Sequence, residues 1–287
     1  MIKLIASDMD GTLLNAKHAI DKATVEAIKA AEKTGITFAI TTGREYDSVK
    51  DHLLGNDLNC QCILMNGAEY RDESGNILEE INIELETATE IIKILQKEKV
   101  SARIFTSKGI YTTDTREEAL KEMLYRTLSF NPEFTEDEAL EFAKTQPFFT
   151  QLNYIKDLKE FLNSGIEIRK FVAFHKNIEL INKLKKIIGE LNGIAVSSSF
   201  KDNMEITHIT AQKGIILAKV SEKMGLKRDE VLVLGDSFND YSMFTEFTES
   251  VAMGNAIPEI KKIAKYITDT NDNLGVAKAI YKVLEKQ

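Results

Sequence analysis

The chain has 287 residues and a formal net charge of −8, and hydrophobic residues make up 43% of it and charged residues 29%. This length exceeds the usual size of one hydrophobic core, so we expect two domains in an ordinary soluble globular protein. The acidic balance argues against a nucleic-acid partner, because such proteins normally carry a basic patch. No apolar run approaches the roughly 18 residues that a membrane span needs, so no membrane partner is expected.

The N-terminal apolar stretch is short and runs into two aspartates, so no secretory signal peptide is expected. The chain has two cysteines, Cys60 and Cys62. They are too close together for a disulfide framework and lack the second Cys/His pair of a zinc site. We therefore expect two reduced thiols in a cytoplasmic protein.

The first part of the chain alternates strand-like and helix-like segments. Short apolar runs predict strands at Ile2–Ser7, Thr37–Thr41 and Cys62–Met65. Asp21 is placed to cap a helix that Gly35 ends, Tyr46–Leu53 predicts a second helix, and residues 73–76 predict a hairpin turn. Strands separated by helices imply right-handed crossovers and a parallel sheet.

The alternation changes between about Glu84 and about Leu191. Strand pairs here look antiparallel, and Asn177–Leu191 carries the apolar stripe of an amphipathic helix. We expect an inserted α+β domain over residues 84–191, between a first core part at 1–83 and a second at 192–287. In the second core part the first pattern returns, with a helix at Lys213–Met224, a buried strand at Val231–Leu234 and a terminal helix at Gly275–Lys286.

Four polar clusters stand where ligands bind in a parallel α/β sheet, after strands or at the start of a helix. They are Asp8-Met9-Asp10-Gly11-Thr12, Thr41-Thr42-Gly43-Arg44, Lys213-Gly214 and Gly235-Asp236-Ser237-Phe238-Asn239-Asp240. Their four carboxylates would repel one another unless a cation or a proton intervened. All are oxygen donors, which favours a hard ion such as Mg²⁺. The lysine and the N–H groups of glycine turns suit a phosphate.

Two carboxylates one residue apart can divide a phosphoryl-transfer reaction between them. One can attack phosphorus and form an aspartyl phosphate, while the other gives a proton to the leaving oxygen and later takes one from water. Asp8 and Asp10 lie just past a strand end, where the chain bends at Gly11, so both side chains can reach one phosphate. We expect one of them to attack and the other to move the proton.

These clusters resemble, in order, the four signature motifs of the haloacid dehalogenase (HAD) superfamily: DMDGTLL, the strand ending in TTGR, the lysine of QKG, and GDSFND. The segments LMNGA, VAMGNA and YITDTNDNLGVAKAI extend the likeness over both core halves, about two-thirds of the chain. The chain is similar to Cof-type phosphatases. The resemblance implies a Rossmann-like parallel-sheet core with a large α/β (type IIB) cap inserted between the second and third motifs.

By that resemblance Asp8 is the nucleophile and a magnesium ligand, and Asp10 is the general acid/base, whose backbone carbonyl also binds the metal. Lys213 offsets charge on the nucleophile and the phosphoryl oxygens. Asp236 is the third metal ligand, and Asp240 supports the metal waters or Lys213. The phosphate contacts fall, besides Lys213, to Met9, Thr42, Gly43 and Asn239. The spacing to Gly43-Arg44 favours Thr42 over its neighbour Thr41.

Each residue also has a plain structural interpretation. A single Asp-x-Asp or Gly-Asp-x-x-Asn-Asp is more often a turn, and a single lysine is more often a solvated helix residue. The four clusters in order favour an active site. Arg44 is given no catalytic role, because it can simply form an ion pair within the core. For Glu205 the structural and the functional interpretation are equally favoured. The histidines are interpreted as non-catalytic; they are His18, His52, His175 and His208.

The sequence therefore predicts a Mg²⁺-dependent phosphatase that hydrolyses small phosphorylated metabolites, with sugar phosphates as the foremost class, through an aspartyl phosphate. A phosphomutase would use the same intermediate and return the phosphoryl group to a second hydroxyl, and the sequence does not decide between the two. A non-catalytic phosphometabolite sensor would be expected to lack Asp8, Asp10 or Lys213, and all three are present.

Overall fold

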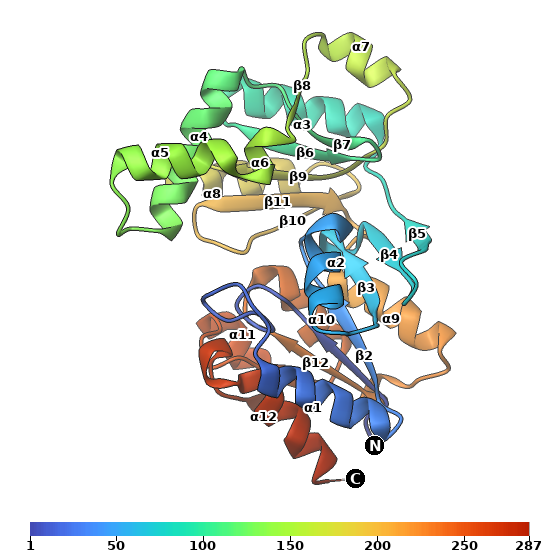
Figure 1. The fold of residues 1–287 in the computed structure, drawn as a ribbon. Coiled ribbons are helices and arrows are strands. Elements are labelled where there is room, and N and C mark those ends of the chain that lie inside the picture. Colours follow the sequence, from blue (N-terminus) through green and yellow to red (C-terminus); the bar gives the residue numbers. More distant parts are fainter. Residues whose placement is uncertain (287) are drawn as a thin grey trace. The chain divides into compact units, whose positions relative to one another are not determined.

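The structure is a computed structural model and describes residues 1–286. The chain forms two compact units (Figure 1). The first, here called the core unit, consists of Met1–Ile81 and the chain from Thr210 onward. The second, here called the inserted unit, is Asn82–Ile209. Within residues 1–286, the structure has no helix that combines the length and the apolar character needed to cross a membrane.

The core unit is built on one eight-stranded sheet, with the order β14-β13-β12-β1-β2-β3-β4-β5. Its strands are β1 (Leu4–Ser7), β2 (Thr37–Thr41), β3 (Gln61–Leu64), β4 (Glu69–Arg71), β5 (Ile77–Glu80), β12 (Val231–Gly235), β13 (Glu249–Ala252) and β14 (Tyr266–Ile267). The pairs from β14 to β3 are parallel, and β3, β4 and β5 pair antiparallel. The predicted parallel sheet and the hairpin at residues 73–76 are confirmed.

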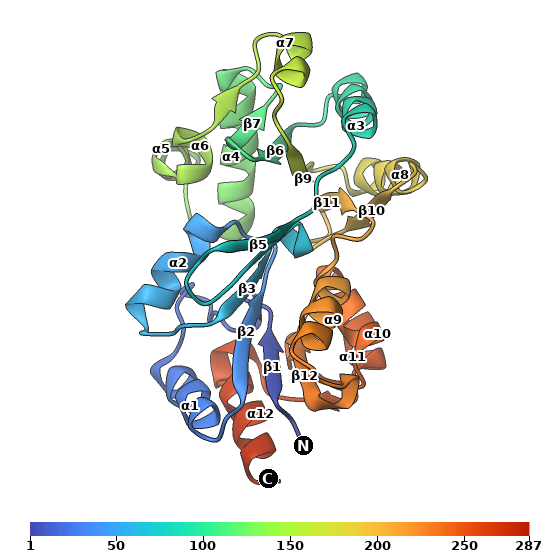
Figure 2. The same cartoon turned by 90° about the vertical axis from the view of Figure 1, so that its right-hand side faces the viewer.

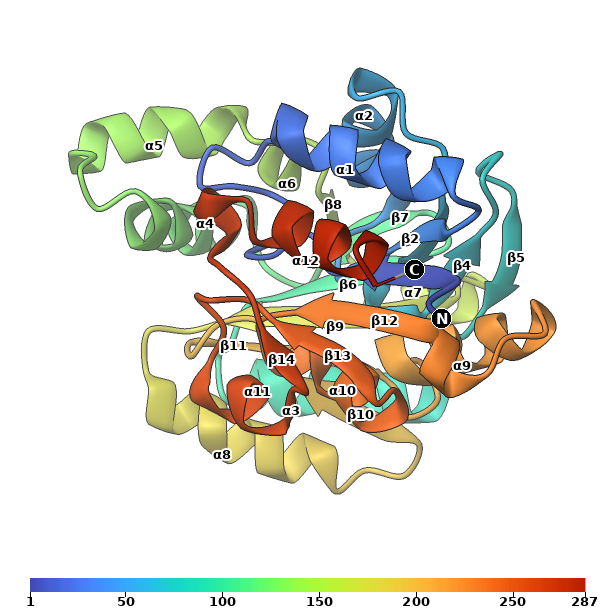
Figure 3. The same ribbon diagram turned by 90° about the horizontal axis from the view of Figure 1, so that it is seen from below.

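Helices cover both faces of this sheet (Figures 2 and 3). One face carries α1 (Lys22–Lys33), α2 (Tyr46–Gly55) and α12 (Gly275–Leu284), and the other carries α9 (Lys213–Lys223), α10 (Tyr241–Glu246) and α11 (Pro258–Ile263). The central strands β1 and β12 are therefore buried along their whole length. Strands that are covered on both faces have nearly continuous apolar sequences, and β1 (LIAS) and β12 (VLVLG) have this pattern.

Helix α1 begins after Asp21 and ends just before Gly35, as predicted. Gly35 has a φ of +87°, and its N–H donates to the Glu32 carbonyl, so it closes the helix in the left-handed conformation that glycine favours. The Asp21 side chain makes no capping hydrogen bond. Its carboxylate instead accepts a hydrogen bond from Asn15 Nδ2 at 3.1 Å, so a tertiary contact replaces the local one.

The inserted unit has a six-stranded sheet with the order β10-β11-β9-β6-β7-β8, antiparallel except for the β7–β8 pair. Its strands are β6 (Ala102–Thr106), β7 (Gly109–Thr112), β8 (Asn153–Tyr154), β9 (Ile168–Phe174), β10 (Ile194–Ser197) and β11 (Asn203–His208). One face packs on α3 (Leu85–Lys97) and α8 (Ile178–Gly189), and the other on α4 (Arg116–Phe130), α5 (Glu136–Thr145) and α6 (Pro147–Thr150) (Figure 2). Helix α7 (Leu158–Asn163) lies between β8 and β9 in the chain.

The end of the inserted unit differs from the boundary expected at Leu191. Strands β10 and β11 lie in the range 192–287 that was assigned to the core, yet β11 pairs antiparallel with β9, and β10 pairs with β11. The unit therefore continues to Ile209. Short strands look alike in sequence whichever sheet they join, so only the pairing identifies the unit to which these two belong.

Candidate active site

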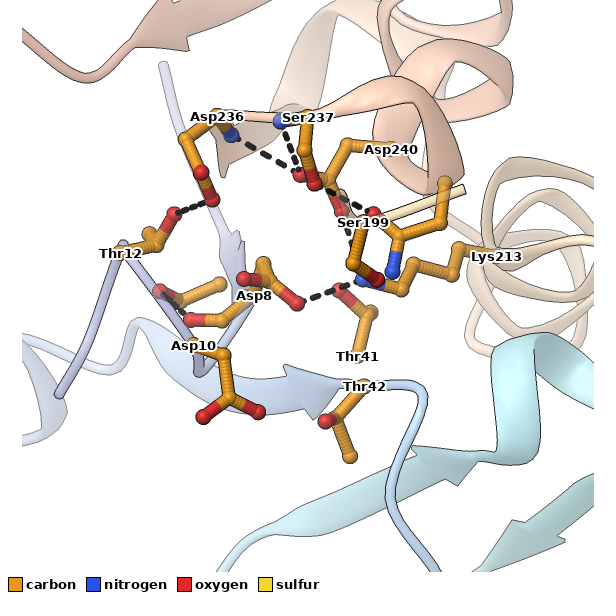
Figure 4. A network of polar contacts seen from close by, with 12 residues as sticks. Asp8, Asp10, Thr12, Thr41, Thr42, Ser199, Lys213, Asp236, Ser237 and Asp240 are labelled. Carbon is orange, nitrogen blue, oxygen red and sulfur yellow. Dashed lines mark hydrogen bonds and ion pairs between the residues drawn. The ribbon is translucent and has the colours of Figure 1, made fainter. Parts of the chain in front are cut away.

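The predicted site residues come together at the carboxyl ends of three neighbouring strands. β1 pairs in parallel with β12 on one side and β2 on the other. Asp8 follows β1, Asp236 follows β12, and Thr42 follows β2, while Lys213 is the first residue of α9. Figure 4 shows these side chains converging from four separate segments of the core unit. This is the edge at which ligands bind in parallel α/β sheets.

Lys213 lies at the centre of the site and is completely buried. Its Nζ is 2.5 Å from Asp8 Oδ1 and 2.6 Å from Asp240 Oδ1 (Figure 4). Burial alone would lower the pKa of Lys213, but the carboxylates of Asp240 and Asp8 outweigh burial and raise the pKa above its usual value. The lysine is therefore a fixed positive charge beside the proposed nucleophile.

Asp8, Asp236 and Asp240 form an acidic cluster in which one oxygen of each lies within 4.8 Å of the others. Burial, followed by the charge of Asp240, raises the pKa of Asp8 well above its usual value and raises the pKa of Asp236 to about 7. One lysine thus does not supply enough positive charge for the three clustered carboxylates. An all-oxygen, electron-rich cluster of this kind fits a hard divalent cation such as Mg²⁺.

Asp240 differs from the other two members of the cluster, because both of its oxygens are already engaged. Oδ1 accepts from Lys213, and Oδ2 accepts the backbone N–H groups of Asp236 at 2.9 Å and Ser237 at 3.1 Å. The side chain is fully buried. This geometry favours the support role for Asp240, which holds Lys213 and the loop after β12, over direct metal ligation.

Gly11 brings the loop after β1 against Asp236. Its φ is +80°, which favours glycine, and a Cβ at this position would lie 2.6 Å from Asp236 Oδ2, so a larger residue would displace the Asp236 carboxylate. The next residue, Thr12, donates from Oγ1 to Asp236 Oδ1 at 3.0 Å. The DMDGT segment therefore shapes the acidic cluster with its backbone and with Thr12, a side chain that the sequence analysis did not assign to the site.

Asp10 is oriented differently from Asp8. Its carboxylate points away from those of Asp8 and Asp236 in Figure 4 and is not part of the acidic cluster. Arg44 holds it, with Nε 2.7 Å from Oδ2 and Nη2 2.6 Å from Oδ1. Burial alone would raise the pKa of Asp10, but the Arg44 guanidinium lowers it below its usual value. Arg44 does pair, as expected, but its partner is the proposed acid/base.

The two threonines after β2 face different surroundings. Thr41 Oγ1 donates to the Met243 sulfur at 3.2 Å within the core. Thr42 Oγ1 accepts the Arg44 N–H at 3.2 Å, and its own hydroxyl hydrogen can still be donated to a ligand. The geometry therefore agrees with Thr42 as the phosphate contact. In the loop after β12, Asn239 Oδ1 accepts from Ser237 Oγ at 2.8 Å, which orients that side chain.

Two asparagines from the last part of the core unit hold the loop that carries Asp10. Asn255 Nδ2 donates to the Gly11 carbonyl at 2.8 Å, and Asn271 Nδ2 donates to the Leu14 carbonyl at 2.9 Å. Asn255 Oδ1 also accepts the N–H of Asn271 at 3.0 Å. These residues fall in the segments VAMGNA and TNDN, whose likeness to the family was visible in the sequence but whose role was not.

Two further predictions concern Glu205 and the two cysteines. Glu205 lies on β11 in the inserted unit and forms an ion pair of 2.5 Å with Lys170 on β9, with both side chains buried. Cys60 and Cys62 are buried free thiols, and Cys62 Sγ donates to the Cys60 carbonyl at 3.6 Å.

A parallel core sheet with an inserted α+β unit and these four clusters in order defines the haloacid dehalogenase-like hydrolases. The sequence profile of that family matches residues 5–280, and the chain belongs to it. Phosphatase YwpJ of Bacillus subtilis (strain 168) is 32% identical over 279 residues, which cover 96% of this chain and 98% of that protein.

Two further relatives cover nearly the whole chain. The 5-amino-6-(5-phospho-D-ribitylamino)uracil phosphatase YwtE of the same organism is 30% identical over 286 residues, 100% of this chain and 99% of that protein. A solved haloacid dehalogenase-like hydrolase from B. subtilis has a TM-score of 0.85 at 31% identity and covers 98% of this chain and 99% of its own. The chain is thus a Cof-type phosphatase of this family, as the sequence predicted.

Proposed function

We propose that the protein is a Mg²⁺-dependent phosphatase that hydrolyses small phosphorylated metabolites, sugar phosphates above all, through an aspartyl phosphate on Asp8. The observation that carries this proposal is the buried contact of Asp8 with Lys213 at 2.5 Å, inside a cluster of carboxylates. A carboxylate held against a fixed ammonium is oriented for attack, and the ammonium offsets the charge that a phosphoryl group brings.

The reaction proceeds in two displacements. An oxygen of Asp8 forms a bond to phosphorus as the bond from phosphorus to the leaving oxygen breaks, and Asp10 gives that oxygen its proton. Water then attacks the phosphorus of the aspartyl phosphate, Asp10 takes the proton of the water, and free phosphate and the Asp8 carboxylate are restored. Through both displacements Lys213 faces the transferring oxygens.

Phosphate binding is assigned to the groups that the family motifs imply. These are the N–H of Met9, the hydroxyl of Thr42, the N–H of Gly43, the Lys213 ammonium and the side chain of Asn239. A bound Mg²⁺ would be held by Asp8, Asp236 and the Asp10 carbonyl, with Asp240 supporting its waters or Lys213, and it would neutralise charge on the phosphoryl group.

The substrate class is inferred from a relative. The name of YwtE describes a phosphate ester on a ribityl chain, which is chemically close to a sugar phosphate. A reaction of the kind proposed needs only a phosphate monoester, so hexose and pentose phosphates and phosphorylated polyols are the compounds to test first.

The test is a panel of phosphate monoesters, assayed for free phosphate with Mg²⁺ and after removal of metal with EDTA. We expect turnover with Mg²⁺, loss with EDTA and recovery when Mg²⁺ is restored. Full turnover without metal would contradict the metal assignment. Isomerised sugar phosphate in place of free phosphate would indicate a phosphomutase, and tight binding of esters with no turnover would indicate a sensor.

A further inference from the structure

Arg44 occupies both oxygens of the side chain that has to move the proton. Its Nε and Nη2 lie 2.7 Å and 2.6 Å from the two Asp10 oxygens, a side-on fork of two parallel hydrogen bonds. In this arrangement the carboxylate points away from Asp8. If Asp10 serves the leaving oxygen, as the proposed function requires, this fork has to open in each catalytic cycle.

The position of Arg44 ties this fork to the phosphate-binding loop. Its backbone N–H donates to Thr42 Oγ1 at 3.2 Å, and its carbonyl accepts the N–H of Met65 at 2.9 Å. The backbone is therefore anchored, while the pair itself is partly open to solvent, with side-chain exposures of 24% for Arg44 and 42% for Asp10. A pair exposed to this degree contributes little net stability, so it can open without a large penalty.

We propose that Arg44 is a positioning residue that exchanges Asp10 for the substrate phosphate. Without substrate, its guanidinium holds the Asp10 carboxylate away from Asp8. A phosphate ester beside Thr42 and Gly43 presents two oxygens of the geometry that the guanidinium fork accepts. The fork turns to the ester, and the released Asp10 side chain is free to turn toward the leaving oxygen. Substrate binding thereby sets the proton-transfer group in place.

The first test is a double-mutant cycle of wild type, Arg44→Ala, Asp10→Asn and the double variant, with formation of the phosphoenzyme measured by rapid quench. The substrates are glucose 6-phosphate, whose alkoxide leaving group needs a proton, and p-nitrophenyl phosphate, whose leaving group does not. Arg44→Ala should raise the half-saturating concentration of both esters several-fold, because each loses the fork that holds its phosphate. In the Asp10→Asn background the same change should raise it by a larger factor, because the fork there binds the ester without a competing carboxylate.

Two controls separate positioning from folding. Arg44→Lys keeps the charge but not the fork, so it should recover only part of the affinity for the esters. Arg71→Ala removes another partly buried guanidinium of the core unit, which contacts Glu69 at 2.5 Å and the Gly75 carbonyl at 2.9 Å. It should change thermal stability but not the half-saturating concentration of either ester. An unchanged half-saturating concentration in Arg44→Ala, or the same factor in the wild-type and Asp10→Asn backgrounds, would overturn the proposal.

A second measurement does not depend on turnover. Inorganic phosphate with Mg²⁺ is titrated into the same four proteins by calorimetry. Asp10→Asn should tighten phosphate binding several-fold, because the guanidinium loses its competing partner, and this gain should vanish in the Arg44→Ala background. An equal gain in both backgrounds would reject the exchange. If wild type binds phosphate in the predicted manner but hydrolyses neither ester, the proposed function fails while the exchange stands.

Discussion

The Lys213 ammonium donates to the Asp8 carboxylate at 2.5 Å, although 205 positions separate the two residues in the chain. The exposures of the two side chains are 0% and 5%. A buried charge of this kind is tolerated only with a partner, so removal of Lys213 leaves Asp8 and Asp240 uncompensated, whereas removal of Asp8 leaves Lys213 paired with Asp240. The pair joins the end of β1 to the start of α9, and it links the stability of the core unit to its chemistry.

We expect Lys213→Met to abolish most of the activity and to destabilise the fold. The variant removes the charge that faces the phosphoryl oxygens, which should lower kcat by about 10²- to 10³-fold. It also leaves Asp8 and Asp240 without their shared cation. Lys219→Met on the same helix is the matched control, because Lys219 forms a solvent-exposed pair with Glu79 at 3.0 Å. It should keep its activity and lose at most about 1 kcal/mol. Near-normal kcat in Lys213→Met would remove this residue from the mechanism.

Substitutions of the two aspartates of the first motif should have different effects on the reaction. Asp8→Asn should form no phosphoenzyme, because an amide is a poor nucleophile. Asp10→Asn should lower kcat about 10²- to 10⁴-fold while still accepting a phosphoryl group from p-nitrophenyl phosphate, whose leaving group needs no proton. Acid quench with ³²P-labelled ester, followed by mapping of the labelled peptide, distinguishes the two. A labelled peptide from Asp8→Asn would show that another residue is the nucleophile.

Metal should stabilise the protein more at high pH than at low pH. The folded-state pKa of Asp236 is about 7, above the ordinary value of 3.8, so between these values the metal-free folded state holds a proton that the unfolded chain has released. Stability from this group is therefore present at low pH and is lost as pH rises through about 7. A cation that binds the charged carboxylates reverses this loss.

The measurement is the Tm of the metal-free protein and of the protein with excess Mg²⁺, at several values from about pH 5 to about pH 8. We expect the increment in Tm from Mg²⁺ to grow with pH. The Asp236→Asn variant should weaken the dependence, because it removes one of the two carboxylates whose pKa is raised. A Mg²⁺ increment that is constant across this range, or that shrinks with pH, would contradict the role assigned to the acidic cluster.

Much of the site was predictable because its signals are local. Asp8, Thr42, Lys213 and Asp236 each stand at a strand end or helix start, and the parallel pairing of β12, β1 and β2 brings such ends to one edge. The fold class followed from the same alternation of strands and helices. The structure adds the distances, the burial and the pairing of Lys213 with two carboxylates.

The features of the site and the fold that were not predicted depend on contacts between residues far apart in the chain, which no local sequence pattern encodes. Arg44 was expected to pair, but its partner lies 34 positions away and is the proposed acid/base. Asp21 was expected to cap α1, but Asn15 competes for its carboxylate. The sequences of β10 and β11 do not indicate which sheet these strands join. The end of the inserted unit is therefore defined only by the pairing of β11 with β9 and of β10 with β11.

Gly11 offers a test of how closely the first motif must approach Asp236. Gly11→Ala meets two obstacles, a φ of +80° and a Cβ that would lie 2.6 Å from Asp236 Oδ2. Gly35→Ala is the matched control, because its φ is +87° but nothing lies within 4 Å of the added Cβ. Both variants should lose about 1 kcal/mol or somewhat more from backbone strain.

Only Gly11→Ala should also impair the site, because the new methyl group displaces a member of the acidic cluster. We expect it to weaken the apparent affinity for Mg²⁺ and to lower kcat at least about 10-fold, the size of effect that a misplaced catalytic group produces. Gly35→Ala should keep wild-type kcat and Mg²⁺ dependence. Thermal unfolding measures the loss of stability that the two variants share. Phosphate release at increasing Mg²⁺ concentration measures the kcat and the Mg²⁺ affinity, in which the two variants should differ. If both variants lose activity in proportion to their stability, the approach of Gly11 to Asp236 matters for folding alone, and the acidic cluster tolerates the displacement.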